Sequence, residues 1–410
     1  MASSLDITAA TAALKQRFAP DAMQFLGYRE NPLYAGLAKD TNAFGENMKT
    51  PVRVDTAQGR SADLATARAN IYAMNLKAFE ITRNDYYAVS QIKGNVVAST
   101  KGNMNAFVDL VSLSLSDLML SHTNDLAGQL FRDGSGGIGT ISSHSNGALS
   151  LTDPDDVTQF SVGQVLQART GTASPHAALG YVISVQRDEG IVTVAASGQG
   201  GISAFPSGWA DGDFLLLEGN ADATLSGLEA WIPDTVSTSD SFFGVNRSID
   251  RTRLAGVVYD GTGMPISQAV VNGTNLIARE GGMPDIAFCS FDTYAALLNE
   301  MGAKVQYVNP TALTKGGIPF QGIELFCSRG KIAVVPDRSC KRNVFYVLEM
   351  KSWKLLSAGG GAPHIDDFGS GGDQWLRLQD SDAYELRTKS YSNLSCNAPG
   401  HNGKIIVDIG

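Results

Sequence analysis

The clearest pattern along the chain lies in residues 103–132, where apolar side chains recur at steps of three and four. The stripe comprises Phe107, Val108, Val111, Leu115, Leu118, Met119, Leu126 and Leu130. This spacing is typical of one buried face of an α-helix, here of roughly seven turns at 3.6 residues per turn. His122 falls on the same stripe and is predicted to be a packed side chain, because no partner His or Cys lies near it.

Residues 46–92 instead show alternation and β-forming side chains. The segments MKTPVRVD and MNLKAFEITRNDYYAVSQI predict the two strands of a long hairpin. The intervening TAQGRSADLATARAN is polar and carries Arg60 and Arg68, so it is predicted to be an exposed tip with little of its own to bury. Residues 1–45 show weak periodicity and predict an arm, with a short helix from Leu5 to Phe18.

Residues 148–222 change to short strands separated by glycines, without helical periodicity. GYVISVQRDEGIVTVAA predicts a tight hairpin, and FSVGQVLQA and DFLLLEG predict further strands. We expect a small all-β module, a barrel or a sandwich, inserted into the larger chain. Its acidic run, Asp153 with Asp155 and Asp156, lacks the spacing of a calcium loop and is predicted to be a solvated turn.

Helix and strand patterns alternate over residues 223–350. A helix is expected to start at Pro265 and end at Gly281, and DIAFCS is apolar enough for a strand buried on both faces. Ser290 is the predicted N-cap of a helix whose stripe comprises Phe291, Tyr294, Leu297, Leu298 and Met301. GIELFC, KIAVVP and NVFYVLEM predict more strands, and residues 351–410 return through β-forming segments, so the fold class is expected to be α+β.

Gly134, Gly136 and Gly139 in FRDGSGGIGTIS have the spacing of the dinucleotide-binding fingerprint GxGxxG. That fingerprint must follow a strand and begin a helix, so that the helix N-terminus faces the pyrophosphate. Here the glycines follow the end of the predicted long helix, whose C-terminal dipole repels phosphate, and precede a polar, non-helical run. The stretch is therefore predicted to be a turn, with Gly134 stopping the helix.

Composition excludes several classes of protein. The net charge of −9, from 32 basic and 41 acidic residues, is unlike the basic face of a general nucleic-acid binder. The four cysteines are far apart and too few for a disulfide scaffold, and Cys289 and Cys327 are expected to be buried thiols. The N-terminus has no secretory signal pattern, and no apolar run of about 18 residues is present.

Candidate chemistry is sparse. The sequence contains no GxSxG, HExxH, GxxxxGK[ST] or HRD motif, and its five histidines lack metal-ligand spacing. His364 with Asp366 and Asp367 lies in a glycine-rich loop and is predicted to be solvated. The basic residues within 329–342 lack the interleaved aromatics that stack on bases and are a candidate partner contact. We assign no catalytic residue, cofactor or metal, and a structural or assembly role is favoured.

The order of these parts resembles the major capsid proteins of tailed bacteriophages, in which an arm, an extended loop and a spine helix precede peripheral and axial domains. LFRDGSGGIGTIS is similar to the family's glycine-rich turn after the spine helix, and CSFDTY stands where the axial domain has a strand cap. The resemblance implies an arm (1–45), an extended loop (46–92), the spine helix with part of the peripheral domain (93–147), an axial domain (223–350) and return strands (351–410). Residues 148–222 match no core element of the family and would be an inserted, outward-facing β domain.

The resemblance further implies an icosahedral shell of hexamers and pentamers around double-stranded DNA, held without sequence-specific contacts, in a virion assembled in the host cytoplasm without a membrane. A portal is implied, and because only about 45 residues precede the loop, a separate scaffolding protein is expected instead of a fused one. Arg53, Arg60 and Arg68 are the candidate contacts with acidic groups of neighbouring subunits. No lysine lies between Thr50 and Asn75, so no covalent cross-link between subunits is expected.

Two alternatives stay open. An encapsulin-like nanocompartment would share the fold and enclose a cargo enzyme, although the inserted β module and the lack of any cargo signal favour a virion. An NAD-dependent oxidoreductase would rest on Gly134 to Gly139 alone.

Overall fold

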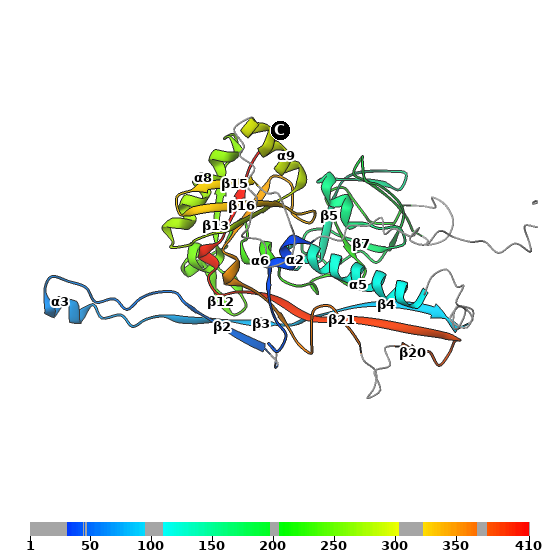
Figure 1. The fold of residues 1–410 in the computed structure, drawn as a ribbon, viewed down its shortest axis with the longest axis horizontal. Helices are drawn as coiled ribbons and strands as arrows, with labels where there is room; N and C mark the ends of the chain where they lie inside the picture. Colours follow the sequence, from blue (N-terminus) through cyan, green and yellow to red (C-terminus); the bar gives the residue numbers. More distant parts are fainter. Residues whose placement is uncertain are drawn as a thin grey trace, which may run out of the picture. The chain divides into compact units, whose positions relative to one another are not determined.

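The computed structural model describes residues 31–43, 45, 47–94, 110–196, 205–302, 323–366 and 375–409. The helix expected from Leu5 to Phe18, the start of the helix expected at 103, and Asp367 lie outside these residues. The chain divides into two compact units. The described residues of the smaller unit fall within 88–121 and 365–388, and the larger unit holds the remainder (Figure 1).

A six-stranded mixed sheet forms one layer of the larger unit, in the order β13–β22–β17–β14–β16–β15. Its strands are β13 (Val257–Asp260), β14 (Ile286–Cys289), β15 (Ile323–Cys327), β16 (Gly330–Pro336), β17 (Val344–Leu348) and β22 (Gly403–Ile406). β14 pairs parallel with β16 and antiparallel with β17. All four residues of β14 are buried, which confirms the strand predicted from DIAFCS.

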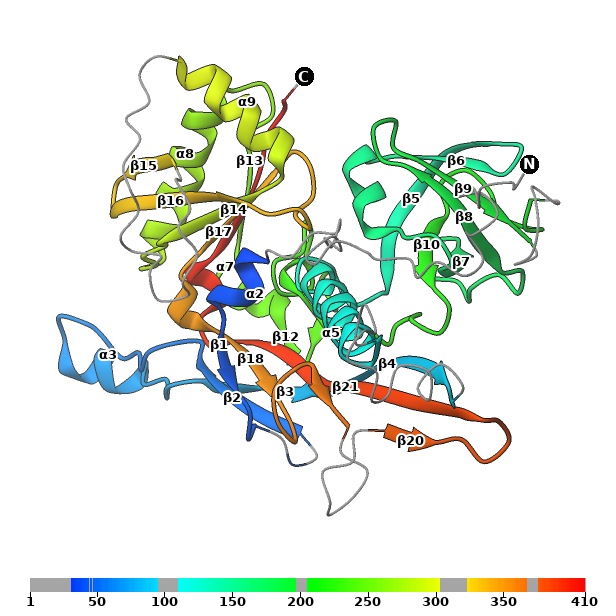
Figure 2. The same ribbon diagram turned by 45° about the vertical axis from the view of Figure 1, so that its right-hand side comes forward.

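Apolar layers cover both faces of this sheet. Helices α8 (Ile266–Arg279) and α9 (Phe291–Met301) pack on one face (Figure 2). Val270 and Leu297 of these helices belong to the same buried apolar cluster as Phe345 of β17. On the other face, Phe131 lies 6.2 Å from the ring of Phe288 and 5.9 Å from that of Tyr346. This arrangement follows from strand alternation, because successive side chains point to opposite faces.

At the start of α9 the predicted N-cap residue is confirmed, but the first residue of the predicted apolar stripe is not buried. Ser290 Oγ accepts the backbone N–H of Thr293 at 3.2 Å, as an N-cap does. Phe291, however, is 47% exposed, whereas Thr293 is fully buried and bonds Ser290 and the backbone N–H of Asn343. The expected stripe is therefore wrong at its first position, because a buried hydroxyl with two partners occupies the place next to the sheet.

A second sheet has the order β1–β18–β21–β19, and β4 and β20 also pair with β21. Its strands are β1 (Ala38–Asp40), β4 (Asn84–Lys93), β18 (Trp353–Ser357), β19 (His364–Ile365), β20 (Trp375–Arg377) and β21 (Ala383–Cys396). The predicted second strand of the long hairpin is thus two strands. β3 (Leu76–Thr82) pairs with β2 (Asn47–Arg53), but β4 leaves the hairpin after Arg83, where Asn84 donates to the carbonyl of Thr224.

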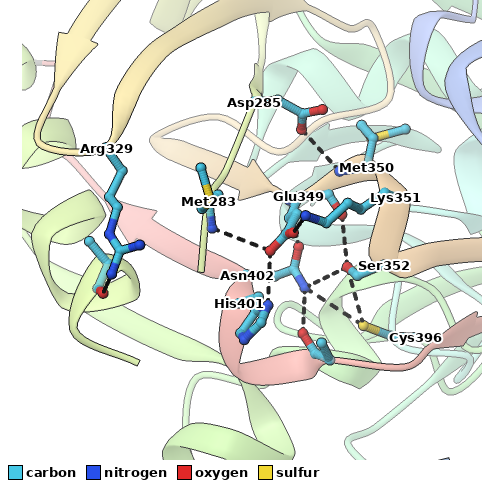
Figure 3. Close-up of polar contacts among 12 residues, drawn as sticks. Met283, Asp285, Arg329, Glu349, Met350, Lys351, Ser352, Cys396, His401 and Asn402 are labelled. Atoms are coloured by element: carbon cyan, nitrogen blue, oxygen red, sulfur yellow. Dashed lines mark hydrogen bonds and ion pairs between the residues drawn. The ribbon is translucent and has the colours of Figure 1, made fainter. Parts of the chain in front are cut away.

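The two connections between these sheets meet at Asn402, which Figure 3 shows in close-up. They are the link from β17 to β18, through η5 (Met350–Ser352), and the link from β21 to β22, through η6 (Pro399–His401). Asn402 Oδ1 accepts the backbone N–H of Glu349 and the indole N–H of Trp353, both at 2.8 Å, and its Nδ2 donates to Ser352 Oγ at 3.0 Å. One buried amide therefore holds both links together.

Glu349 adds an ionic contact to this junction. Its carboxylate lies 2.9 Å from His401 Nδ1, pairs with Lys351 and accepts the backbone N–H of Met283 at 3.3 Å. Burial works to raise the pKa of Glu349, but the hydrogen bonds from Lys351 and Met283 and the charge of His401 outweigh it. The pKa of this carboxyl is therefore held below its ordinary value of 4.5.

Helix α5 (Leu110–Gln129) supplies a stripe of buried side chains that includes His122, Leu126 and Leu130 just beyond its end. His122 is fully buried with its ring 5.2 Å from that of Tyr86, and burial lowers its pKa to about 4. The prediction of a packed histidine is confirmed. Gly134 (φ 91°) is not what ends the helix, because α5 ends at Gln129, and the carbonyl of Leu130 accepts Leu228 N–H at 2.7 Å.

The chain then forms a closed six-stranded barrel, in the order β10–β5–β6–β9–β8–β7. Its strands are β5 (Gly137–Ser145), β6 (Ala148–Leu151), β7 (Val165–Arg169), β8 (Gly180–Gln186), β9 (Ile191–Ala195) and β10 (Phe214–Leu217). The predicted boundary at 148 is wrong, because β5 begins 11 residues earlier, counting from 137 to 148. The polar half of β5 is exposed and does not alternate cleanly, so its sequence reads as a turn.

The acidic run of the barrel is not the solvated turn predicted from sequence. In the short helix η1 (Pro154–Gln159), Asp156 pairs with Arg132, which is only 8% exposed. Asp153 accepts the backbone N–H groups of Asp155 and Arg342, both at 3.1 Å. A buried guanidinium must have a counter-charge, and this requirement draws the run inward.

The other short elements of the larger unit are α2 (Pro32–Gly36), α3 (Leu64–Ala69), α6 (Leu228–Trp231), β11 (Ser241–Phe242), β12 (Val245–Asn246), η2 (Arg247–Ile249) and α7 (Arg251–Ala255). Within the described ranges, no helix combines the length and the apolar character that a membrane span requires.

Candidate assembly surface

The β2–β3 hairpin is fixed at its base. Val52, Phe79 and Ile81 are buried, and the ring of Phe79 meets that of Trp231 edge-on at 5.0 Å. The backbone N–H of Glu80 donates to the carbonyl of Phe243 at 2.9 Å, and Thr50 Oγ1 lies 3.1 Å from Ser395 Oγ. The base is therefore part of the core of the larger unit.

The rest of the hairpin, residues 55–78, contains no buried residue, and we call it the hairpin tip. It is nevertheless regular. Gln58 and Tyr72 exchange two backbone hydrogen bonds of 2.9 and 3.1 Å, and Asp63 caps α3 by accepting Thr66 N–H at 2.8 Å. The hydrogen bonds from the Thr66 backbone and hydroxyl hold the pKa of Asp63 below its usual range. In Figure 1 the tip, with α3 at its end, extends away from the other elements of its unit, and Figure 2 agrees.

Apolar side chains crowd the hairpin tip. Their exposed fractions are 65% for Leu64, 70% for Ile71, 54% for Tyr72, 46% for Met74 and 59% for Leu76. An isolated two-stranded hairpin is at best marginally stable in water, and a short helix without a packed face is no better. An exposed apolar cluster on such a projection is typical of a surface that another chain covers.

The arginines predicted as contacts all lie on this hairpin and are exposed. Arg53 is the last residue of β2, Arg60 donates to Gln58 Oε1 at 2.8 Å, and Arg68 lies in the last turn of α3. Within the part of the chain that the structure describes, none of the three forms an ion pair. Their role as contacts with neighbouring subunits stays a prediction.

Sequence reasoning missed the apolar residues of the tip. It assigned Met74 and Leu76 to a strand and described the segment before them as polar. The signal was the cluster in IYAMNL (71–76), where four of six side chains are apolar or aromatic beyond alanine. The pattern offers no other element of the chain that could cover this cluster. An apolar cluster in a segment predicted to be exposed could therefore have indicated a surface that another chain covers.

The other candidate residues have partners within the chain. Lys331 pairs with Glu324 at 2.9 Å and Lys341 with Glu229 at 2.7 Å, while Arg329 donates to the carbonyl of Ala278. The basic concentration is thus spread over separate local contacts. His364 Nδ1 lies 2.8 Å from the carbonyl oxygen of Gly361, and the backbone N–H of Asp366 donates to the carbonyl of Arg387.

The cysteines are free thiols. Cys289 is fully buried, as expected, and burial raises its pKa, so this thiol stays protonated and unreactive near neutral pH. Cys327 is only half-buried, because β15 is at the end of its sheet. No group of three or more His, Cys, Asp or Glu side chains that could hold a metal ion occurs among the residues described.

No family model matches the sequence, and no curated protein matches it either. Solved structures do. A chain of the cyanophage A-1(L) capsid asymmetric unit matches with a TM-score of 0.58 and 12% identity, over 95% of each chain. A chain of the capsid of a native GTA particle matches with a TM-score of 0.49 and 8% identity, over 99% of each chain.

The holo-SrpI encapsulin complex from Synechococcus elongatus PCC 7942 also matches, with a TM-score of 0.46 and 8% identity, over 100% of this chain and 97% of that one. Because the GTA and encapsulin scores lie below 0.5, the assignment rests on the cyanophage chain. The protein has the mixed α and β fold of a phage capsid chain.

Proposed function

We propose that this protein is the structural subunit of an icosahedral capsid shell that encloses the double-stranded DNA of a tailed phage, and that it catalyses no reaction. The observation that carries the proposal is the hairpin tip, which is regular and rich in exposed Leu, Ile, Tyr and Met side chains but has no buried residue of its own. A second copy of the chain supplies the missing cover, as expected for a subunit whose interfaces are larger than about 2,000 Å².

In this proposal each tip lies on an adjacent subunit within hexamers and pentamers, and closed symmetry repeats the contact around the shell. Arg53, Arg60 and Arg68 pair with acidic groups of the neighbour and fix the register of the contact. A separate scaffolding protein and a portal complete the assembly, and DNA fills the interior without sequence-specific contacts.

The test is to express the chain alone and with its neighbouring genes, and to image the products by negative-stain electron microscopy. Closed shells or capsomers are expected, and a compact monomer under every condition would contradict the proposal. Ile71→Asp should prevent assembly, because it places a charge in the covered apolar surface. Val162→Asp, a matched change at a 66% exposed position of the barrel, should not. Shells that retain a co-purified enzyme instead of DNA would favour an encapsulin-like compartment.

A further inference from the structure

A cavity of about 580 Å³ lies where the barrel joins the rest of its unit. The glycine-rich turn forms one wall with Asp133, Gly134 and Ser135. The end of β7 forms another with Arg169, together with Thr172 in the loop that follows. Phe214 and Leu216 of β10 supply the apolar part of the lining. The volume is within the range of about 300–1,000 Å³ that is typical of small-molecule sites.

An ion pair between the buried Arg169 and the exposed Asp222 lies on the polar side of this cavity. The Arg169 side chain is only 6% exposed; its Nη1 bonds Asp222 Oδ2 at 2.8 Å, and its Nε donates to the carbonyl of Gly171 at 3.0 Å. Nη2 has no hydrogen-bond partner among the residues that the structure describes, so it can donate to a ligand. Asp222 has a φ of 54°, a left-handed conformation that is uncommon for residues other than glycine.

The charged side chains around the cavity indicate which class of ligand it could bind. Arg169 contributes one positive charge, while Asp222 and Asp133 contribute two negative ones. A phosphate or carboxylate would meet both carboxylates, and a cation would meet the buried guanidinium, so neither ion is well matched. A neutral ligand with many hydroxyl groups is matched by both, because carboxylates accept hydroxyl protons and a guanidinium donates to hydroxyl oxygens.

The apolar lining points to the same class. Phe214 lines the cavity and is 42% exposed. Gly134, Gly137 and Gly171 have no side chains, so a ligand can approach the backbone closely. We propose that this cavity binds a carbohydrate, with one pyranose ring on Phe214 and its hydroxyls bonded to Asp133 and Arg169. The inference is independent of shell assembly.

The test uses the purified full-length protein in buffer free of glycerol and other polyols. The probes are the methyl glycosides of glucose, galactose, mannose and N-acetylglucosamine, each at about 10 mM, which is tenfold above a dissociation constant of about 1 mM. Binding is detected by saturation-transfer difference NMR. At least one glycoside is expected to give a saturable signal, and no signal from any of the four would overturn the proposal.

Two variants place the binding in the cavity. Phe214→Ala should weaken it about fivefold through the lost ring contact. Asp133→Asn, which can still accept from Ser135 but has no charge, should weaken it about fivefold as well. Phe326→Ala removes a 72% exposed ring on β15 and should change nothing. A glycoside signal that both cavity variants leave unchanged would also overturn the proposal, and unchanged melting curves show that each variant is folded.

Discussion

The barrel and the hairpin tip belong to the same unit but bury their apolar side chains to opposite extents. The barrel closes on itself, and residues such as Phe160, Leu166 and Val192 are fully buried inside it. The tip also carries large apolar side chains, yet Leu64 and Ile71 are more than 60% exposed. Both segments have regular backbone hydrogen bonds, so the difference is in packing alone.

This difference separates two sources of stability. A closed barrel has a hydrophobic core without any partner, because each strand has two neighbours. The tip has only its own two strands, so its ordered state gains apolar burial when another chain covers it. Substitutions inside the barrel should therefore lower the stability of the isolated subunit. Substitutions in the tip should leave that stability unchanged and impair assembly.

Removing the tip should have the largest effect on assembly and almost none on the isolated subunit. The variant replaces residues 56–73 with an Asn-Gly turn, which suits a two-residue hairpin loop between Asp55 and Met74. The melting temperature of the subunit should stay the same, because no deleted residue is buried, while sedimentation velocity should detect no capsomers or shells. Normal shells from this variant would remove the basis of the comparison.

Phe160→Ala should instead lower the stability of the isolated subunit. Phe160 is fully buried in the barrel core, and truncating a buried phenylalanine typically costs about 3–5 kcal/mol. Urea denaturation followed by tryptophan fluorescence should report this loss, because Trp209 lies in the same core. Ile183→Ala, at a 37% exposed position of the barrel, is the matched control and should have little effect. A stability equal to wild type would mean that the barrel core is not closed.

The junction at Glu349 belongs to neither region and should respond to pH. Its pKa lies below 4.5 in the folded protein and near 4.5 in the unfolded chain, so its contribution is present above about pH 4.5 and is lost as the pH falls through the lowered folded value. Glu349→Gln should remove this part of the acid sensitivity in melting curves measured between about pH 3 and 6. A variant with the acid sensitivity of wild type would contradict the prediction.

The three arginines of the hairpin should give the smallest effect. Replacing Arg53, Arg60 and Arg68 together with alanine should weaken assembly modestly and make it less dependent on salt, because exposed ion pairs contribute about 0.2–1 kcal/mol each. The concentration at which shells appear, measured by light scattering at two salt concentrations, tests this. Replacing the three arginines with lysine keeps the positive charges and should restore most of the assembly that alanine removes. A complete loss of assembly with alanine would instead mean that the arginines lie in a desolvated contact.

The parts of the fold that could be predicted from the sequence are those that depend on residues close together in the chain. The strand Ile286–Cys289, the cap at Ser290 and the buried His122 were correctly predicted, because each depends on neighbouring residues. Predictions that needed distant partners were less successful. The pairing of β4 with β21 joins segments about 300 residues apart, and the ion pair of Arg132 with Asp156 joins residues 24 apart. Local periodicity in the sequence indicates neither contact.

The candidate surface was likewise only half predicted. The position of the tip and its arginines followed from polarity, but its apolar residues were assigned to a strand, because alternation gives the direction of a side chain and not whether anything covers it. The start of the barrel at Gly137 was missed for a similar reason, since the exposed end of β5 has the composition of a loop.

The two links into and out of the barrel cross at Gly136. Asp222 N–H donates to the carbonyl of Ser135 at 3.1 Å, and a Cβ on Gly136 would lie 2.2 Å from the carbonyl oxygen of Asn220. Because its ends are adjacent, the barrel is an insertion that a foreign domain with closely spaced termini could replace. The replacement must supply a carboxylate for the buried Arg132, which pairs with Asp156 of the barrel. In the proposed shell, each subunit would then display one copy of the foreign domain.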